Sequence, residues 1–142
     1  MTREATIRSG LTIRKNGLQY KSLVDQYFAD MNGTKGPSPG SLTVSLAGVA
    51  VDFSELTTPA LCRIVNYDTA NTLHYGISDG TEFYPLGEIQ AGESYVIRLS
   101  SLLGRSVAIV GTGSGTYDGG TYQLFLKADV APIVCSVEAF DA

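Results

Sequence analysis

Residues 60–100 read ALCRIVNYDTANTLHYGISDGTEFYPLGEIQAGESYVIRLS, and this stretch decides the fold class. It holds short runs rich in apolar and β-branched residues, at 61–66, 73–78, 82–86 and 95–99, separated by residues typical of turns. Strands are enriched in such residues, whereas Gly, Asp and Asn clusters separate strands from one another. An apolar period of 3.6 residues, which would indicate a helix, is missing from the stretch. We therefore expect a β-meander here.

The dipeptide Asp79-Gly80 lies between the second and third of these runs. Asp-Gly between two β-rich runs is a strong signal for a two-residue hairpin, because both central residues of a type I′ turn need a positive φ. The sequence predicts such a hairpin at this point.

The N-terminal residues also predict an extended hairpin. From residue 5 to 14 small or apolar side chains alternate with Thr and Arg, Asn16-Gly17 is a second turn signal, and Leu18 and Tyr20 continue the alternation. Residues 23–31, LVDQYFADM, fit either a short helix or an extended crossing. Residues 32–41, NGTKGPSPGS, predict an irregular loop or linker.

These boundaries divide the chain into an N-terminal arm and hairpin (1–31), a Gly/Pro-rich loop (32–41) and a body (42–142). In the body, residues 42–46 and 49–53 flank Ala47-Gly48 and are expected to pair. Further strands are expected at 106–110, 121–127 and 133–140, with a glycine-rich loop at 111–120. About nine or ten strands at this spacing predict an all-β fold, an antiparallel β-sandwich or jelly roll with an extended N-terminal arm.

Length and composition agree with one folded domain. The chain has 142 residues, of which 44% are hydrophobic and 17% charged; a chain of about 150 residues buries roughly 68–70% of its unfolded surface. Its N-terminus is polar and no apolar run is long enough to cross a membrane, so we expect synthesis in a cytoplasm and no contact with a membrane.

The formal net charge of −4 is unevenly distributed. Residues 1–22 hold five basic residues and one acidic residue, a net charge of +4, and the remainder holds five basic and thirteen acidic residues, a net charge of −8. Such a segment favours docking onto an acidic neighbour, another copy included, or it is a solvated edge strand protected by charge. The basic residues are too few for nucleic-acid binding. The candidate partner-binding residues are Arg3, Arg8, Arg14, Lys15 and Lys21.

Candidate reactive groups are few. Cys62 and Cys135 lie in expected strands, where we favour buried free thiols over a disulfide; together with His74, the only histidine, they are too few for a structural zinc site. Residues 111–120 lack the Lys-Ser/Thr of a phosphate-binding loop, and the loop carboxylates lack a calcium-loop framework. We expect that the protein is not an enzyme and that it binds no cofactor. A tyrosine group fits either a subunit interface or the core: Tyr67, Tyr75, Tyr84 and Tyr95.

Several stretches resemble the small virion-associated proteins of tailed double-stranded DNA bacteriophages. They are GPSPGSLTVS (36–45), LTTPALCRIVNYDTANTLHYGISDG (56–80), FYPLGEI (83–89), AGESYVIRLS (91–100) and VEAF (137–140). The resemblance covers about half of the chain and brings no catalytic residue with it.

The resemblance implies a virion structural protein on the capsid surface, foremost a head decoration (cement) protein. Such a protein binds the major capsid protein or another virion protein, stabilises the shell and self-associates, with a trimer favoured. A tail, neck or fibre component and a carbohydrate-binding module of the virion are the alternatives. The arm is then expected to add a strand to a neighbour, or to fold back on its own body.

Overall fold

The computed structural model describes residues 3–100, 103 and 122–142. These residues form no helix and contain twelve strands in antiparallel sheets, which confirms the all-β class. In chain order the strands are β1 (Ala5–Ser9), β2 (Thr12–Lys15), β3 (Leu18–Lys21), β4 (Asp25–Ala29), β5 (Ser38–Val44), β6 (Val49–Ala50), β7 (Pro59–Asn66), β8 (Leu73–Ser78), β9 (Phe83–Ile89), β10 (Ser94–Arg98), β11 (Gln123–Ala128) and β12 (Ile133–Asp141).

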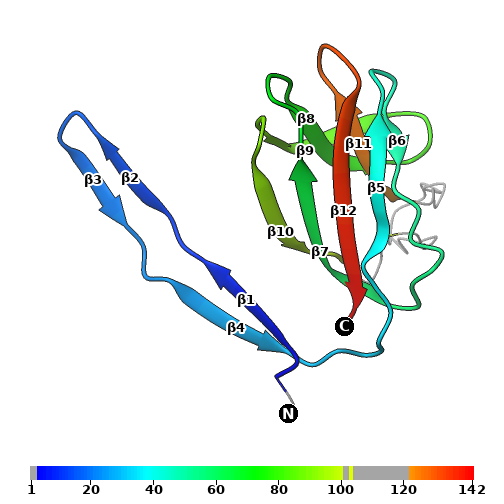
Figure 1. Cartoon of the computed structure of the whole chain (residues 1–142), viewed down its shortest axis with the longest axis horizontal. Coiled ribbons are helices and arrows are strands. Elements are labelled where there is room, and N and C mark those ends of the chain that lie inside the picture. The colour runs from blue at the N-terminus through cyan, green and yellow to red at the C-terminus, as the bar shows by residue number, and fades with distance from the viewer. Residues whose placement is uncertain (1–2, 101–102, 104–121) are drawn as a thin grey trace, which may run out of the picture.

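Strands β5–β12 form the body of the molecule as two four-stranded sheets (Figure 1). One sheet has the order β10-β7-β12-β5 and the other the order β6-β11-β8-β9. Buried side chains from both sheets belong to a single hydrophobic cluster, among them Ile64, Leu73, Ile89, Leu126 and Val137. Because each of these side chains is fully buried, this cluster contributes the main hydrophobic stabilisation of the body.

The expected meander over residues 60–100 is wrong, although each of its four strands exists. β8 pairs with β9, whereas β7 pairs with β10 and β12 in the other sheet. The chain therefore crosses between the sheets after Asn66 and returns after Ile89. The apolar runs indicate that these strands are buried, but burial does not determine which strands pair with each other.

The hairpin at Asp79-Gly80 is confirmed, but the two-residue turn is wrong. β8 ends at Ser78 and β9 begins at Phe83, so four residues connect them. Gly80 alone has a positive φ in this loop, at +94°. The Asp79 carboxylate accepts hydrogen bonds from the backbone N–H groups of Thr81 and Glu82, at 2.9 and 2.8 Å. This side-chain cap stabilises a wider loop than the type I′ turn.

A β-bulge interrupts the pairing of β8 with β9 between Tyr75 and Gly76. A Cβ atom on Gly76 would collide with the carbonyl oxygen of Tyr84 and would lie 2.9 Å from the Phe83 ring. The bulge therefore depends on glycine at this position, where the two strands approach each other closely.

The predicted pairing of residues 42–46 with 49–53 is also wrong. β5 pairs with β12, and the two-residue β6 pairs with β11 in the opposite sheet. In addition, β5 begins at Ser38, inside the stretch 32–41 that was expected to be a loop. Pro39 and Gly40 are residues typical of loops, so the sequence does not indicate a strand here. A proline is tolerated at this position because β5 is an edge strand. The expected strand at 106–110 and loop at 111–120 lie outside the described residues.

Residues 3–31 form the N-terminal hairpin that the sequence predicts, and we call them the arm. β1 pairs with β4 in its inner segment, and β2 pairs with β3 in its outer segment. Asn16 and Gly17 have φ values of 45° and 87°, as a type I′ turn requires, so this turn is confirmed.

The ambiguous stretch 23–31 contains the strand β4 and not a helix. Three residues, 22–24, separate β3 from β4, opposite only two, Gly10 and Leu11, between β1 and β2. The additional residue is a bulge that divides each long strand in two, which partly explains why twelve strands are found where nine or ten were expected.

Candidate interaction surface

The arm projects from one end of the body, and its tip at Asn16-Gly17 points away from it (Figure 1). Its four strands pair only with one another, and none of their residues is buried. An isolated two-stranded hairpin is at best marginally stable in water, because it has no third layer against which to bury apolar side chains. The arm is therefore a surface that lacks a covering partner within the described part of this chain.

Apolar side chains lie opposite one another along the arm. In the inner segment Ile7 is opposite Tyr27, and in the outer segment Ile13 is opposite Tyr20. Strand residues that face each other across a ladder project on the same side of the sheet. The exposed large apolar residues of the arm are Leu11, Ile13, Leu18, Tyr20, Leu23, Val24, Tyr27 and Phe28.

The five predicted partner-binding residues are all on the arm and all exposed, but they are spread along its length. Arg3 precedes β1, and its guanidinium carbon lies 4.6 Å from the centre of the Phe28 ring, within cation–π range. Arg8 is in β1, whereas Arg14, Lys15 and Lys21 are in the outer segment. That segment, residues 12–21, holds three basic residues and no acidic residue, and two of the three, Arg14 and Lys15, lie beside the tip.

The root of the arm is attached to the body, although residues 32–41 were expected to be an irregular loop or linker. The buried Asp141 carboxylate accepts hydrogen bonds from the backbone N–H of Thr57 (3.0 Å) and of Thr58 (2.7 Å), and its backbone N–H donates to the carbonyl oxygen of Lys35. The Asn32 amide lies 3.4 Å from the Thr58 hydroxyl. These contacts attach residues 32–35, which directly follow the arm, to the body.

The edges of the two sheets differ in how well they are protected. β5 and β9 contain Pro39 and Pro85, and β6 is only two residues long. Proline and short length both prevent a further strand from adding to an edge. β10 has the sequence SYVIR, with neither feature, and it pairs only with β7. Among the described strands of the body, β10 is therefore the one open edge of useful length.

The β10 edge is apolar and has acidic residues at its N-terminal end. Tyr95 and Val96 are exposed, at 45% and 51%. The Tyr95 hydroxyl donates to the Glu93 carboxylate at 3.2 Å. This hydrogen bond, followed by the charges of Glu93 and Glu88, raises the pKa of Tyr95 above its usual value. We define the β10 edge as Tyr95, Val96 and the two carboxylates of Glu88 and Glu93.

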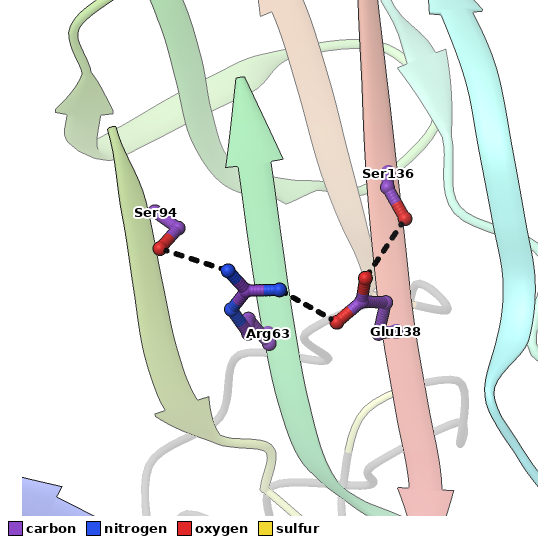
Figure 2. Close-up of polar contacts among 4 residues, drawn as sticks. All are labelled: Arg63, Ser94, Ser136 and Glu138. Carbon is purple, nitrogen blue, oxygen red and sulfur yellow. Dashed lines mark hydrogen bonds and ion pairs between the residues drawn. The ribbon is translucent and has the colours of Figure 1, made fainter. Parts of the chain in front are cut away.

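A polar chain of contacts holds β10 in place (Figure 2). The Arg63 guanidinium of β7 forms an ion pair with Glu138 of β12 at 3.0 Å and donates to the Ser94 hydroxyl of β10 at 3.4 Å. Ser136 approaches the other Glu138 oxygen at 3.5 Å. Because the Arg63 and Glu138 side chains are 46% and 27% exposed, the pair adds little free energy. Its effect is to align three neighbouring strands across the outer face of their sheet.

Both cysteines are buried free thiols, as the sequence favours. Cys62 and Cys135 lie on the neighbouring strands β7 and β12, four residues apart in register. Burial raises the pKa of Cys62 to about 12, with a smaller contribution from the Glu138 charge, and the pKa of Cys135 to about 11. At neutral pH these thiols are protonated and therefore poor nucleophiles.

His74 is in β8, where it pairs with Glu88 of β9 and Lys127 of β11. No group of three or more potential metal ligands occurs among residues 3–100, 103 and 122–142. The loop carboxylates are those of Asp68, Asp79, Glu82 and Asp118. Asp68 and Asp79 accept backbone hydrogen bonds within two separate turns, and these bonds lower both pKa values. Asp118 lies outside the described residues.

The clefts in the described part of the body include two open ones near aromatic side chains. The larger, about 650 Å³, lies near Phe53, Leu99 and Leu103; the other, about 620 Å³, contains Phe83 and Phe125, whose ring centres are 5.4 Å apart. Neither His74 nor a cysteine is among the described residues that line these clefts. We therefore regard the arm and the β10 edge as the better candidates for a functional surface.

Comparison with known proteins adds no relative: no family model matches the chain, and neither a curated protein nor a solved structure is significantly similar to it. Among the described residues, no helix is long and apolar enough to span a membrane.

Proposed function

We propose that this chain is a structural protein of a tailed-bacteriophage virion, foremost a head decoration protein that self-associates as a trimer and stabilises the capsid shell. The observation that carries the proposal is the arm, a basic, apolar hairpin attached firmly to a compact body and left uncovered by it. A protein that acts by contact needs such an extension, because it supplies edge backbone and apolar area to a neighbour.

In this proposal the two four-stranded sheets are the layers of a β-sandwich or jelly roll, and the chain acts without a catalytic group or cofactor. The body provides rigidity, and the arm binds the neighbouring subunit in the particle. Several arms on one oligomer bind together, so a weak single contact becomes tight overall.

The resemblance to virion proteins noted in residues 36–45, 56–80 and 83–100 motivates the choice of a phage particle as the setting. The same architecture would also serve a tail, neck or fibre protein. A carbohydrate-binding module is the further alternative, for which the exposed Tyr67, Tyr84 and Tyr95 would supply stacking surfaces.

The decisive experiment locates the protein on purified particles by cryo-electron microscopy. Density for the body on the outer capsid surface is the expected result. Density on the tail or neck would replace the decoration assignment with the first alternative, and absence of the protein from purified particles would overturn the proposal.

Binding to the shell can be tested with expanded capsids that lack the protein. The double substitution Arg14→Ser/Lys15→Ser should weaken co-sedimentation about tenfold at moderate ionic strength, since two charges near the arm tip are lost. Lys127→Ser, which removes a positive charge from β11 of the body, is the control and should bind as the unmodified protein does. Equal binding by all three proteins would show that the basic arm is not the contact.

A further inference from the structure

The arm and the β10 edge have complementary properties. The outer segment of the arm carries three basic residues, no acidic residue and the exposed side chains of Ile13, Leu18 and Tyr20. The β10 edge carries two carboxylates beside the exposed Tyr95 and Val96. Opposite charge near apolar area is the combination that directs and stabilises a specific contact between protein surfaces.

The backbone geometry of the two elements is complementary as well. β2 and β3 each have one neighbour, so each has an outer row of backbone N–H and C=O groups open to a further strand. β10 offers the same open row on the body, without the proline found in β5 and β9. Strand addition joins two such rows through backbone hydrogen bonds, while side-chain contacts determine the register.

The arm does not reach the β10 edge of its own body in this structure. Its root is attached to the body through Lys35, which contacts Asp141, and Asn32, which contacts Thr58, and its tip points away from the body (Figure 1). The edge, in turn, is held in position by the pairing of β10 with β7 over Ser94–Arg98. Because the arm and the β10 edge do not meet within one molecule, they are available for contact between two molecules.

The order of charges also suggests an orientation. β10 has Glu93 at its N-terminal end and Arg98 at its C-terminal end. The basic residues beside the tip of the arm are Arg14 and Lys15, whereas its acidic residues Glu4, Asp25 and Asp30 lie in or beside the inner segment. With the tip at the Glu88 and Glu93 end of the edge, Arg14 and Lys15 lie beside these two carboxylates.

We propose that the outer segment of the arm docks as an added strand on the β10 edge of a second copy of this protein, with its tip at Glu88 and Glu93. This inference deepens the proposed function, on which it rests for the premise that the chain works within an assembly. The contact joins two different surfaces, so copies linked in this way close into a ring when the rotation between them permits. A trimer is one such ring.

Site-specific cross-linking between two singly substituted variants tests the contact directly. Gln19→Cys places a thiol on β3 of the arm, and Val96→Cys places one on the β10 edge. The native thiols are buried, with pKa values of about 11 and 12, so a bismaleimide reacts with the introduced cysteines only. Val134→Cys is the matched control, because Val134 is 50% exposed and Val96 is 51% exposed, but Val134 lies in β12 away from the edge.

The expected result is a covalent dimer when Gln19→Cys is mixed with Val96→Cys, at least tenfold more abundant than with Val134→Cys. Equal yields with the two partners would overturn the inference, as would a dimer formed by Gln19→Cys alone in greater yield, since that product indicates contact between arms.

A charge exchange provides an independent measurement of the same contact. Lys15→Glu and Glu88→Lys should each raise the dissociation constant of the oligomer about tenfold, because Lys15 lies beside the tip of the arm, and the double variant should recover most of that loss. Glu55→Lys introduces the same charge change on an exposed residue outside the edge and should have no effect. Light scattering reads the outcome as a fall towards the monomer mass of 15.1 kDa. A double variant as weak as the sum of the singles would overturn the inference.

These experiments use the purified protein without capsids, so the two proposals fail separately. A protein that is monomeric at micromolar concentration and yet decorates capsids overturns arm exchange and the trimer, and leaves the proposed role on the capsid intact. A protein that exchanges arms but is absent from virions supports the contact between arm and β10 edge and overturns the proposed function.

Discussion

The body and the arm are built from the same kind of element but stabilised in different ways. In the body, two sheets bury Leu126, Ile64 and Val137 completely. In the arm, pairs such as Ile13 and Tyr20 face each other across a ladder with no second layer above them. The difference shows that strand pairing alone organises the arm, whereas burial between layers stabilises the body.

The largest expected difference in stability between the two regions follows from removing a large apolar side chain from each. Leu126→Ala leaves a cavity between the two sheets and should lower the free energy of unfolding by about 2–5 kcal/mol. Leu18→Ala, at a residue that is 59% exposed on the arm, should change it by less than about 0.5 kcal/mol in dilute solution. Urea unfolding measures both variants. A comparable loss for Leu18→Ala would show that the arm is packed against something in the free protein.

The second expected effect concerns the junction between the two regions. Asp141→Ala leaves the backbone N–H groups of Thr57 and Thr58 without their acceptor and should cost about 1–3 kcal/mol. It should also accelerate proteolysis between residues 32 and 37, because the carboxylate holds Thr57 and Thr58, which are the residues that the Lys35 and Asn32 side chains contact.

Limited proteolysis and urea unfolding give these two readouts, and Glu55→Ala, at an exposed acidic residue of the body, is the control. If cleavage of the root stayed at the control rate while stability fell, Asp141 would stabilise the body without fixing the arm.

The smallest expected effect on stability at neutral pH comes from ionisation of the buried thiols. Their reactivity tests whether the core of the body is closed to solvent. The folded pKa values of about 12 for Cys62 and about 11 for Cys135 exceed the value of 9.0 for an exposed thiol. Because the unfolded chain ionises first, the stability contribution is complete below pH 9 and is lost as the pH rises from 9 towards 12. At pH 8 a thiol reagent should react with the unfolded protein and hardly at all with the native protein. Rapid reaction of the native protein would contradict the burial of both side chains.

Much of the strand content follows from the sequence. β8 and the Asn16-Gly17 turn have the predicted positions, because apolar alternation and positive-φ residues are local signals. The pairing of β7 with β10 and β12 could not be predicted, because a buried strand looks the same whichever strand lies beside it. β5 was missed in part because Pro39 and Gly40 suggest a loop, and at an edge they are compatible with a strand.

Of the two candidate surfaces, only the arm could be predicted from the sequence. The charge of the arm is a local property, and Arg14, Lys15 and Lys21 could be identified without a structure. The β10 edge combines residues of β10 with Glu88 of β9, and its openness depends on which strands flank β10. The sequence did contain one indication, an edge-length run without proline that follows two carboxylates. That indication acquires meaning only with the sheet order.

The position of Asp141 has a practical consequence for engineering. Because it lies beside Gly33 and the Lys35 carbonyl, a peptide fused after Ala142 would emerge next to the root of the arm and obstruct whatever the arm binds. The turn between β11 and β12 is at the opposite end of the body in Figure 1, and Val130 in that turn is 72% exposed. Cargo or an epitope inserted in this turn would be displayed away from the arm.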